Sequence, residues 1–257
     1  MTPNGHGLVT VRIDVPGGTL AGDYLPGGGP FAVLWVHGFG SHRGGEKSAA
    51  VRAECDRRGW PFAAFDFRGH GDSTGDILDL RASGLLDNLD AARRLLAGRG
   101  HTRLGLVGSS LGGFAAAWYA KRHPDAVVGC VFVAPGFGFL DRRWNPLTDA
   151  ERDEWRRTGR RRITSDWVDL EVGYGLVEER EAFTPAALAA GWSLPALLFH
   201  GCADEVVPDT DSLAFLRAAA SPDVELRLLK SGDHRLTDYK DEIAAATGQF
   251  FTRLLGA

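Results

Sequence analysis

Hydrophobic and polar residues alternate along the first part of the chain and then give way to an apolar run. The alternation covers Leu8–Val15 and Thr19–Leu25, on either side of a Pro-Gly-Gly turn. This pattern predicts an antiparallel hairpin at the edge of a sheet. Phe31–His37 (FAVLWVH) is a continuous apolar run that ends in histidine. Such a run is expected for a strand that is buried on both faces.

Beyond this strand, segments with helical and with strand patterns alternate. Helices are predicted over Lys47–Arg58, Leu80–Leu96, Leu111–His123 and Asp238–Leu255, and strands over Pro61–Phe67, Arg103–Gly108, Val127–Ala134, Leu194–His200 and Val224–Leu229. Strands that alternate with helices of this size form βαβ units. We therefore predict an α/β fold with a mostly parallel central sheet and helices on both faces.

The rhythm breaks between residues 136 and 192, where four tryptophans occur and no clear strand is visible. A connection of this length usually has a function or structure of its own. We predict that residues 136–192 form a small helical cap over the carboxyl edge of the sheet. Residues 1–135 and 193–257 then form the core into which the cap is inserted.

Composition and charge narrow the classes of partner. The 257 residues are 44% hydrophobic and 24% charged, with a formal net charge of −4. The chain has no overall positive charge that would favour binding to nucleic acid or to a membrane surface. No apolar run approaches the roughly 20 residues of a membrane-spanning helix. The N-terminal MTPNGHG lacks a secretory signal pattern, so we expect a cytoplasmic protein. Nothing in the sequence indicates an oligomeric state.

No metal site or cofactor is expected. Cys55, Cys130 and Cys202 are odd in number and far apart, which argues against disulfides and a zinc site. They are predicted to be small buried residues. The glycine-rich stretch GFGSHRGGEK lacks the spacing of a phosphate-binding loop.

The clearest chemical motif is GSSLGG, which contains G-x-S-x-G with Ser110 at its centre. It follows a predicted strand and opens a predicted helix, which is the context of a nucleophilic serine on a tight turn. Glycines on either side relieve the crowding of that turn. A helix N-terminus behind the serine favours the negative charge that develops during attack. The motif alone also fits a glycine-rich turn with an idle serine.

A serine hydroxyl needs a base, and the chain offers eight histidines. His234 lies in SGDH, between the last predicted strand and the last predicted helix. That position fits the chain order nucleophile, acid, histidine. His42 and His70 lie in loops near the same edge, but both precede the nucleophile. His37 and His200 end strands just before glycines, where we expect them to hold loops.

The acid is expected in the loop after the preceding strand, which reads HGCADEVVP. Asp204 is the predicted acid, and Glu205 is its carboxylate neighbour. Asp141 and Asp149, after an earlier strand, are weaker rivals. The carboxylate fixes the histidine tautomer and stabilises the imidazolium. The alternative is a surface turn in which Asp204 only caps the helix after Pro208.

A tetrahedral intermediate needs donors for its oxyanion. We predict the backbone N–H of Leu111, directly after the nucleophile, as one donor. The second is expected from the loop HGFG after the first buried strand, where the N–H of Phe39 is the candidate. The alternative for this loop is an ordinary glycine turn.

Five segments carry a family resemblance: WVHGFGS, DFRGHGDS, GSSLGG, HGCADEVVP and GDH. They occur in the order found in α/β-hydrolases, which the chain resembles over essentially its whole length. GSSLGGF, HPD and SGDHRL are also similar to the acyl-protein thioesterase and acyl-glucuronide esterase subgroup of lysophospholipase-like hydrolases. The resemblance implies the fold and the Ser-His-Asp triad. It also implies that DFRGHGDS shapes the loop beside the nucleophile, and we expect Asp66 and Arg68 to hold that loop.

The predicted cap supplies candidates for substrate binding. Phe137, Trp144, Trp155 and Trp167 are expected to line an apolar acyl pocket, although aromatic residues in a cap also pack it onto the sheet. The segment ERDEWRRTGRRR (151–162) fits a solvated helix with internal ion pairs. A sharper hypothesis is that the arginines at 160–162 reach an anionic group, such as a coenzyme A phosphate or a glucuronate.

We therefore predict a serine hydrolase that cleaves small acyl esters or thioesters through an acyl-enzyme. One alternative is a proline-iminopeptidase-like amidase, which needs cap acids to hold a substrate amine; Glu171, Glu178, Glu179 and Glu181 are available. Another is a carbon–carbon bond hydrolase on the same scaffold. A non-catalytic binding protein is the third, since a fold does not fix a function. The complete Ser, His and Asp set argues against it.

Overall fold

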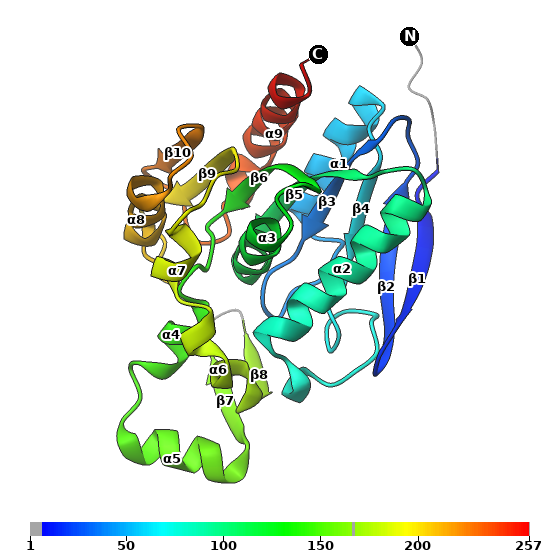
Figure 1. The fold of residues 1–257 in the computed structure, drawn as a ribbon. Coiled ribbons are helices and arrows are strands. Elements are labelled where there is room, and N and C mark those ends of the chain that lie inside the picture. The colour runs from blue at the N-terminus through cyan, green and yellow to red at the C-terminus, as the bar shows by residue number, and fades with distance from the viewer. Residues whose placement is uncertain (1–6, 166–167, 257) are drawn as a thin grey trace.

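An eight-stranded sheet runs through the middle of the molecule (Figure 1). The computed structural model describes residues 7–165 and 168–256. Strand β2 is antiparallel to both of its neighbours, and every pairing from β4 to β10 is parallel. Across the sheet the strands are β1 (Val9–Val15), β2 (Gly18–Leu25), β4 (Phe62–Phe65), β3 (Phe31–Val36), β5 (Arg103–Ser109), β6 (Val127–Val133), β9 (Ala196–Gly201) and β10 (Val224–Leu229).

Helices cover both faces of this sheet, as the apolar run in β3 predicts. Val33 and Trp35 of β3 pack in one core with α1 and α9, while Leu34 and Val36 pack in a second core with α2 and α3. Successive strand residues point to opposite faces, so a strand buried on both sides is apolar throughout. The helices of the core are α1 (Glu46–Arg58), α2 (Ala82–Gly98), α3 (Leu111–Arg122), α8 (Asp209–Ala218) and α9 (Lys240–Leu255).

Each strand and helix predicted outside residues 136–192 is present, with ends within two residues of the prediction. The hairpin is correct, and β1 forms one edge of the sheet. The predicted fold class is thus confirmed. Parallel strands bring their carboxyl ends to one edge of a sheet. The loops after β3, β5, β9 and β10 therefore meet at that edge, where the predicted site residues lie.

Residues 136–192 are not wholly helical, which corrects the prediction for this segment. Helix α5 ends at Gly159, whose φ of 72° terminates it, and the arginines that follow form a strand. Strands β7 and β8 pair antiparallel and project beyond the main sheet with α5 (Figure 1). The elements are α4 (Phe139–Trp144), α5 (Asp149–Thr158), β7 (Arg160–Thr164), β8 (Asp169–Gly173), α6 (Gly175–Glu178), η2 (Arg180–Ala182) and α7 (Pro185–Ala189).

Two further sequence expectations concern burial and membranes. Cys55 and Cys130 are buried as expected, and burial raises the pKa of both thiols. Cys202 is exposed instead, because it lies in the turn after β9 rather than in the strand. In the described residues, none of the helices combines the length and the apolar character needed to cross a membrane.

Candidate active site

Ser110 lies on a strained turn between β5 and α3. Its φ of 53° and ψ of −117° place a non-glycine residue in a region that costs conformational energy. A Cβ on Gly112 would lie 2.1 Å from the carbonyl oxygen of Val36, and one on Gly108 would lie 2.4 Å from that of Gly112. Glycine at both positions lets the turn pack this closely. This packing explains the G-x-S-x-G spacing.

The structure brings Ser110, His234 and Asp204 together, although they are far apart in the chain. Nε2 of His234 lies 3.0 Å from Oγ of Ser110, and Nδ1 lies 2.8 Å from Oδ2 of Asp204. Because the carboxylate only accepts, Nδ1 carries the proton and Nε2 is free to accept from the hydroxyl. Asp204 follows β9 and His234 follows β10, two neighbouring strands.

Asp204 is held as an anion. Its side chain is inaccessible to solvent. Oδ1 accepts from the backbone N–H groups of Val206 and Val207, each at 2.8 Å. Burial opposes the charged form, but hydrogen bonds from His200, His234 and Val207 outweigh it and hold the pKa of Asp204 well below its usual range. An ionised carboxylate therefore faces the imidazole of His234.

His200 is a second partner of this carboxylate that sequence reasoning assigned only to a loop. Its Nε2 lies 3.2 Å from Oδ2 of Asp204 and 3.0 Å from the carbonyl oxygen of Val207. Both partners are acceptors, so Nε2 carries the proton. Nδ1 then accepts from the hydroxyl of Ser212 at 2.7 Å. The sequence showed only that His200 precedes a glycine at the end of β9. Its contact with Asp204 could not be predicted, because it depends on how the following loop folds.

The two predicted oxyanion donors belong to segments that adjoin Ser110. Leu111 is the first residue of α3, where a backbone N–H has no acceptor within its own helix. Phe39 belongs to the loop after β3, next to Gly38. A Cβ on Gly38 would lie 3.3 Å from Cβ of Ser110. The loop that carries Phe39 thus packs directly against the serine.

Ser110 lies in the wall of a cavity of about 580 Å³. The described lining combines apolar side chains with basic and acidic ones and with His234: Trp35, Phe39, Phe139, Ile163, Val168, Val206, Lys47, Arg142, Arg143, Arg235, Glu46, Glu205 and His234. A cavity in which polar groups converge beside apolar side chains is typical of a small-molecule site. In the described residues no cluster of three or more His, Cys, Asp or Glu side chains is arranged to hold a metal ion.

The comparison with known families now decides the classification. A family model described as alpha/beta hydrolase fold matches residues 32–207, which is more than half of the 257 residues. The chain belongs to the alpha/beta hydrolase family. The matched region of this hydrolase includes the G-x-S-x-G turn and Asp204.

Named relatives point to one branch of the alpha/beta hydrolases. The "Palmitoyl-protein thioesterase ABHD10, mitochondrial" of Mus musculus is 27% identical over 240 residues, which cover 90% of this chain and 76% of the relative. The human protein of the same name is also 27% identical, over 90% of this chain and 74% of its own length. These matches confirm the similarity to the thioesterase subgroup that the short segments predicted.

Solved structures agree with the fold of this hydrolase. "Alpha/beta hydrolase domain-containing protein 10 from mouse" superposes with a TM-score of 0.79 at 25% identity, covering 97% of this chain and 98% of that one. Est1E from Butyrivibrio proteoclasticus with bound ferulic acid has a TM-score of 0.78 at 20% identity, covering 96% of this chain and 100% of that one. At that identity Est1E shows the fold alone.

The predicted cytoplasmic location is wrong by this comparison, because the curated relatives are named as mitochondrial proteins. The prediction rested on the lack of a secretory pattern at the N-terminus. That pattern is specific to export from the cell, and its absence carries no information about organelles.

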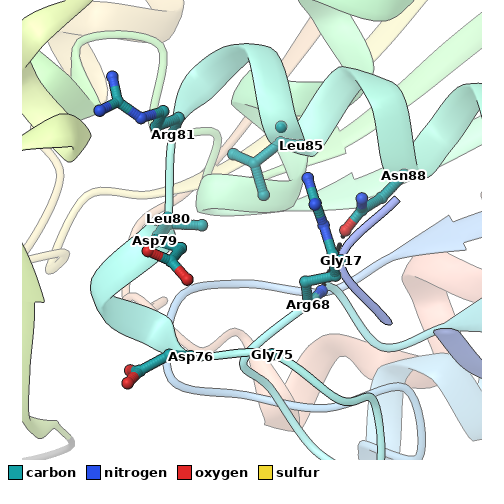
Figure 2. A pocket seen from close by; sticks show the side chains of 10 residues that line it. Gly17, Arg68, Gly75, Asp76, Asp79, Leu80, Arg81, Leu85 and Asn88 are labelled. Carbon is teal, nitrogen blue, oxygen red and sulfur yellow. Dashed lines mark hydrogen bonds between the residues drawn. The ribbon is translucent and has the colours of Figure 1, made fainter. Parts of the chain in front are cut away.

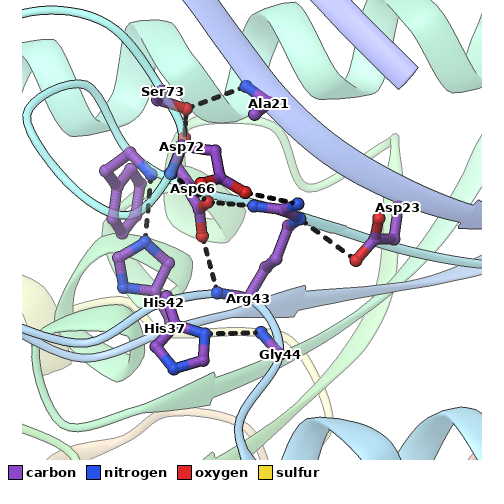
Figure 3. Close-up of polar contacts among 10 residues, drawn as sticks. Ala21, Asp23, His37, His42, Arg43, Gly44, Asp66, Asp72 and Ser73 are labelled. Carbon is purple, nitrogen blue, oxygen red and sulfur yellow. Dashed lines mark hydrogen bonds and ion pairs between the residues drawn. The ribbon is translucent and has the colours of Figure 1, made fainter. Parts of the chain in front are cut away.

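In this hydrolase, an ionic cluster ties the loop after β3 to the loop after β4 (Figure 3). The backbone N–H of Arg43 donates to Oδ1 of Asp66 at 2.6 Å, and its guanidinium also pairs with Asp66. Nε of Arg43 lies 3.0 Å from Asp23, and Nη2 lies 2.9 Å from Asp72. Asp66 therefore holds the loop that carries Phe39, as expected from DFRGHGDS. The contribution of Arg43 was not foreseen.

Replacing Asp66 with alanine is expected to lower the free energy of unfolding by about 3–5 kcal/mol, because it leaves a largely buried guanidinium without its main partner. The side chain of Asp66 is inaccessible, and that of Arg43 is 15% exposed. Urea denaturation of the variant measures the loss. Asp72→Ala is the matched control, because this carboxylate is 69% exposed and its loss should cost below about 1 kcal/mol. Equal losses in both variants would contradict the assignment.

Arg68, the second residue of DFRGHGDS that was expected to hold a loop, lies away from the cavity at Ser110. Its backbone N–H donates to Oδ1 of Asn88, and its guanidinium donates to the carbonyl oxygen of Pro16. It lines a separate hollow of about 90 Å³ beside α2 (Figure 2), which shares no lining residue with the cavity at Ser110. Arg68 thus joins the loop after β4 to α2 and to the first hairpin.

Three of the four predicted substrate-binding aromatics are absent from the described lining of the cavity. Phe137 is buried between Phe132 and Phe215. Trp144 and Trp155 are buried with Tyr174 inside the 136–192 segment. Packing of this segment therefore uses these side chains, which was the alternative interpretation. Trp167 lies outside the described residues. The aromatic lining comes instead from Trp35, Phe39 and Phe139.

Proposed function

We propose that this chain cleaves carboxylic esters or thioesters of small acyl substrates with Ser110 as nucleophile, His234 as general base and acid, and Asp204 as the acid that orients the histidine. The observation that carries the proposal is the continuous hydrogen-bonded chain from Oγ of Ser110 through His234 to Asp204, with distances of 3.0 and 2.8 Å. The coarser conclusion, an ester or thioester hydrolase, follows from relatives named as thioesterases and from the hydrolase family.

The reaction would proceed in two halves. Oγ of Ser110 bonds to the acyl carbon while its proton moves to Nε2 of His234, and the carbonyl electrons move onto oxygen. The N–H groups of Leu111 and Phe39 stabilise this oxyanion. When the intermediate collapses, the leaving group takes the proton from His234, and an acyl-enzyme remains. Water then attacks the acyl carbon with the same base, and the acid product leaves Ser110 restored.

Labelling with a fluorophosphonate probe tests the nucleophile directly. We expect covalent phosphonylation at one site, and mass spectrometry of the digested protein should place it on Ser110. Ser109→Ala is the matched control because it removes the neighbouring hydroxyl and keeps the labelled one. Labelling that survives in Ser110→Ala, or that disappears in Ser109→Ala, would overturn the assignment.

No contact in the described residues favours the amidase alternative. Among the acids proposed to hold a substrate amine, Glu171 pairs with Arg160 and Glu178 pairs with Arg81. Glu179 accepts from Ser83, and Glu181 pairs with Arg180. Each carboxylate is therefore engaged, and none is in the described lining of the cavity.

We further propose that residues 136–192 act as the cap of this enzyme. Phe139, Arg142 and Arg143 from α4, together with Ile163 and Thr164 from β7, belong to the cavity lining. The segment would thus exclude water from Ser110 and supply contacts for the substrate. A panel of 4-nitrophenyl esters and acyl thioesters of increasing chain length would define the acyl group that these contacts select.

A further inference from the structure

The charged side chains that line the cavity at Ser110 differ in their exposure to solvent. Lys47, Arg142 and Arg143 are half-buried, whereas the acids Glu46 and Glu205 are exposed. The two carboxylates of the lining are thus in contact with solvent, whereas the charged side chains that are partly shielded from water are all positive. Electrostatic interactions strengthen as water is excluded, so the interior favours a negatively charged group.

Within residues 7–165 and 168–256, Arg143 has no counter-charge. Its guanidinium lies 4.7 Å from the ring centre of Phe139 and 5.8 Å from that of Phe39. Its Nε is buried with no hydrogen-bond partner, and no carboxylate of the described residues pairs with it. Burial, with a smaller contribution from Arg142, lowers the pKa of Arg143 to about 10. The group stays charged at neutral pH, and its buried Nε–H is uncompensated.

Arg142, the preceding residue of α4, adds a second buried donor to the wall of the cavity. One side of its guanidinium pairs with Asp211. Its Nη2 is buried and has no hydrogen-bond partner. A Cβ on Gly136 would lie 3.6 Å from this nitrogen and 3.4 Å from the carbonyl carbon of Ser110. An unsatisfied donor therefore lies close to the backbone of the nucleophile.

The arginines that the sequence singled out for this purpose are already paired. Arg160 contacts Glu171, Arg161 contacts Glu151, and Arg162 forms two hydrogen bonds of 2.6 Å with Asp169. All three lie on β7 and are absent from the described lining of the cavity. The arginines at 160–162 are therefore poor candidates for binding an anionic group, and Arg142 and Arg143 of α4 are better ones.

The position of α4 indicates which half of the substrate it faces. His234 returns its proton to the leaving group, so that group must lie on the His234 side of Ser110. Lys47 belongs to this side, because its Nζ donates to the carbonyl oxygen of Arg235. A cation there would contact the leaving group.

Arg143 is placed by α4 and by the loop that carries Phe39. The turn before α4 is fixed to the nucleophile, since the N–H of Gly136 donates to the carbonyl oxygen of Ser110 at 2.9 Å. The guanidinium then lies over Phe39, whose backbone is the proposed oxyanion donor. Both contacts lie on the side of the loop after β3 and the turn before α4, and neither involves the loop of His234, so we assign Arg143 to the acyl half.

We infer that Arg143, assisted by Arg142, binds a carboxylate at the far end of the acyl group, so that the preferred substrates are half-esters or half-thioesters of dicarboxylic acids. The guanidinium fork matches the two oxygens of a carboxylate. Apolar side chains of the lining, such as Ile163 and Val168, would flank the methylene chain. This inference rests on the proposed function, because the substrate must be attached through its other carboxyl group to Ser110.

Kinetics of Arg143→Met with matched substrates test the site. We expect kcat/KM for the 4-nitrophenyl half-ester of adipic acid to fall by about 10- to 100-fold, mainly through KM. The neutral analogue, 4-nitrophenyl methyl adipate, should change by less than about twofold. Arg143→Lys should restore part of the lost preference, because it keeps the charge and loses the fork. Arg160→Met is the matched control, since it removes an arginine that is paired outside the cavity.

Two results would overturn the inference. One is an equal loss for the charged and the neutral adipate esters in Arg143→Met, which would indicate a purely structural role. The other is a loss confined to 4-carboxyphenyl hexanoate, which carries its carboxylate on the leaving group. The affinity of the wild type and of Arg143→Met for adipate, measured by calorimetry, tests the site without turnover. Failure of the proposed chemistry would abolish all ester cleavage but leave the difference in adipate binding intact.

Discussion

Replacing Ser110 with alanine is expected to lower kcat for 4-nitrophenyl esters by about 10⁶-fold, the scale seen when a triad serine is removed from a serine hydrolase. Without Oγ no acyl-enzyme forms, and His234 has no hydroxyl to deprotonate. The remaining rate would come from the oxyanion donors and from binding alone. Initial rates at saturating ester, with the variant purified free of wild type, provide the measurement.

The stability of this variant separates chemistry from folding. Alanine at a φ of 53° is as strained as serine, so the free energy of unfolding should stay within about 1 kcal/mol of the wild type. A folded Ser110→Ala that keeps more than about one hundredth of the wild-type kcat would exclude Ser110 as the nucleophile, because that loss is far below the one expected.

Sequence predicted the parts of this molecule that local pattern determines. The alternation in Leu8–Leu25 and the apolar run in β3 correspond to strands whose side chains meet one or both cores. The turn at Ser110 was predictable because the close approach of Gly112 to β3 leaves a fixed spacing of glycines in the sequence. In each case the structure of a short segment is determined by residues within that segment, so its sequence alone indicates the structure.

The remainder depends on contacts between distant segments. A helix over residues 151–162 was reasonable by charge pattern, but Gly159 ends α5 and Arg160–Thr164 finds a partner strand. Trp144 and Trp155 were aromatic candidates for a pocket, yet whether an aromatic side chain packs inward or lines a cavity depends on its neighbours. The contacts of Arg43, Arg143 and His200 likewise arise only in the folded chain.

Replacing Asp204 with asparagine is expected to reduce kcat by about 10⁴-fold with little change in KM, as for other triads in which the acid becomes an amide. The amide presents an N–H₂ donor where Nδ1 of His234 needs an acceptor. The imidazole then adopts the wrong tautomer, and its positive charge is no longer stabilised during attack.

Glu205→Gln is the matched control for Asp204→Asn, because it neutralises the adjacent, exposed carboxylate. It should change kcat by less than about threefold, because an exposed charge is screened. Comparable losses in both variants would refute the assignment.

The dependence of stability on pH provides an independent check on Asp204. Its pKa in the folded protein lies below its usual range. The ionised carboxylate therefore stabilises the fold above the unfolded-state pKa of about 3.9, and this contribution is lost as pH falls below that value. Asp204→Asn should remove that part of the acid-induced loss, so the unfolding free energies of the two proteins should differ less at pH 3 than at pH 7. A difference that stays constant between these pH values would mean that Asp204 is not held as an anion. The same carboxylate that orients His234 thus contributes to the stability of the loops after β9 and β10.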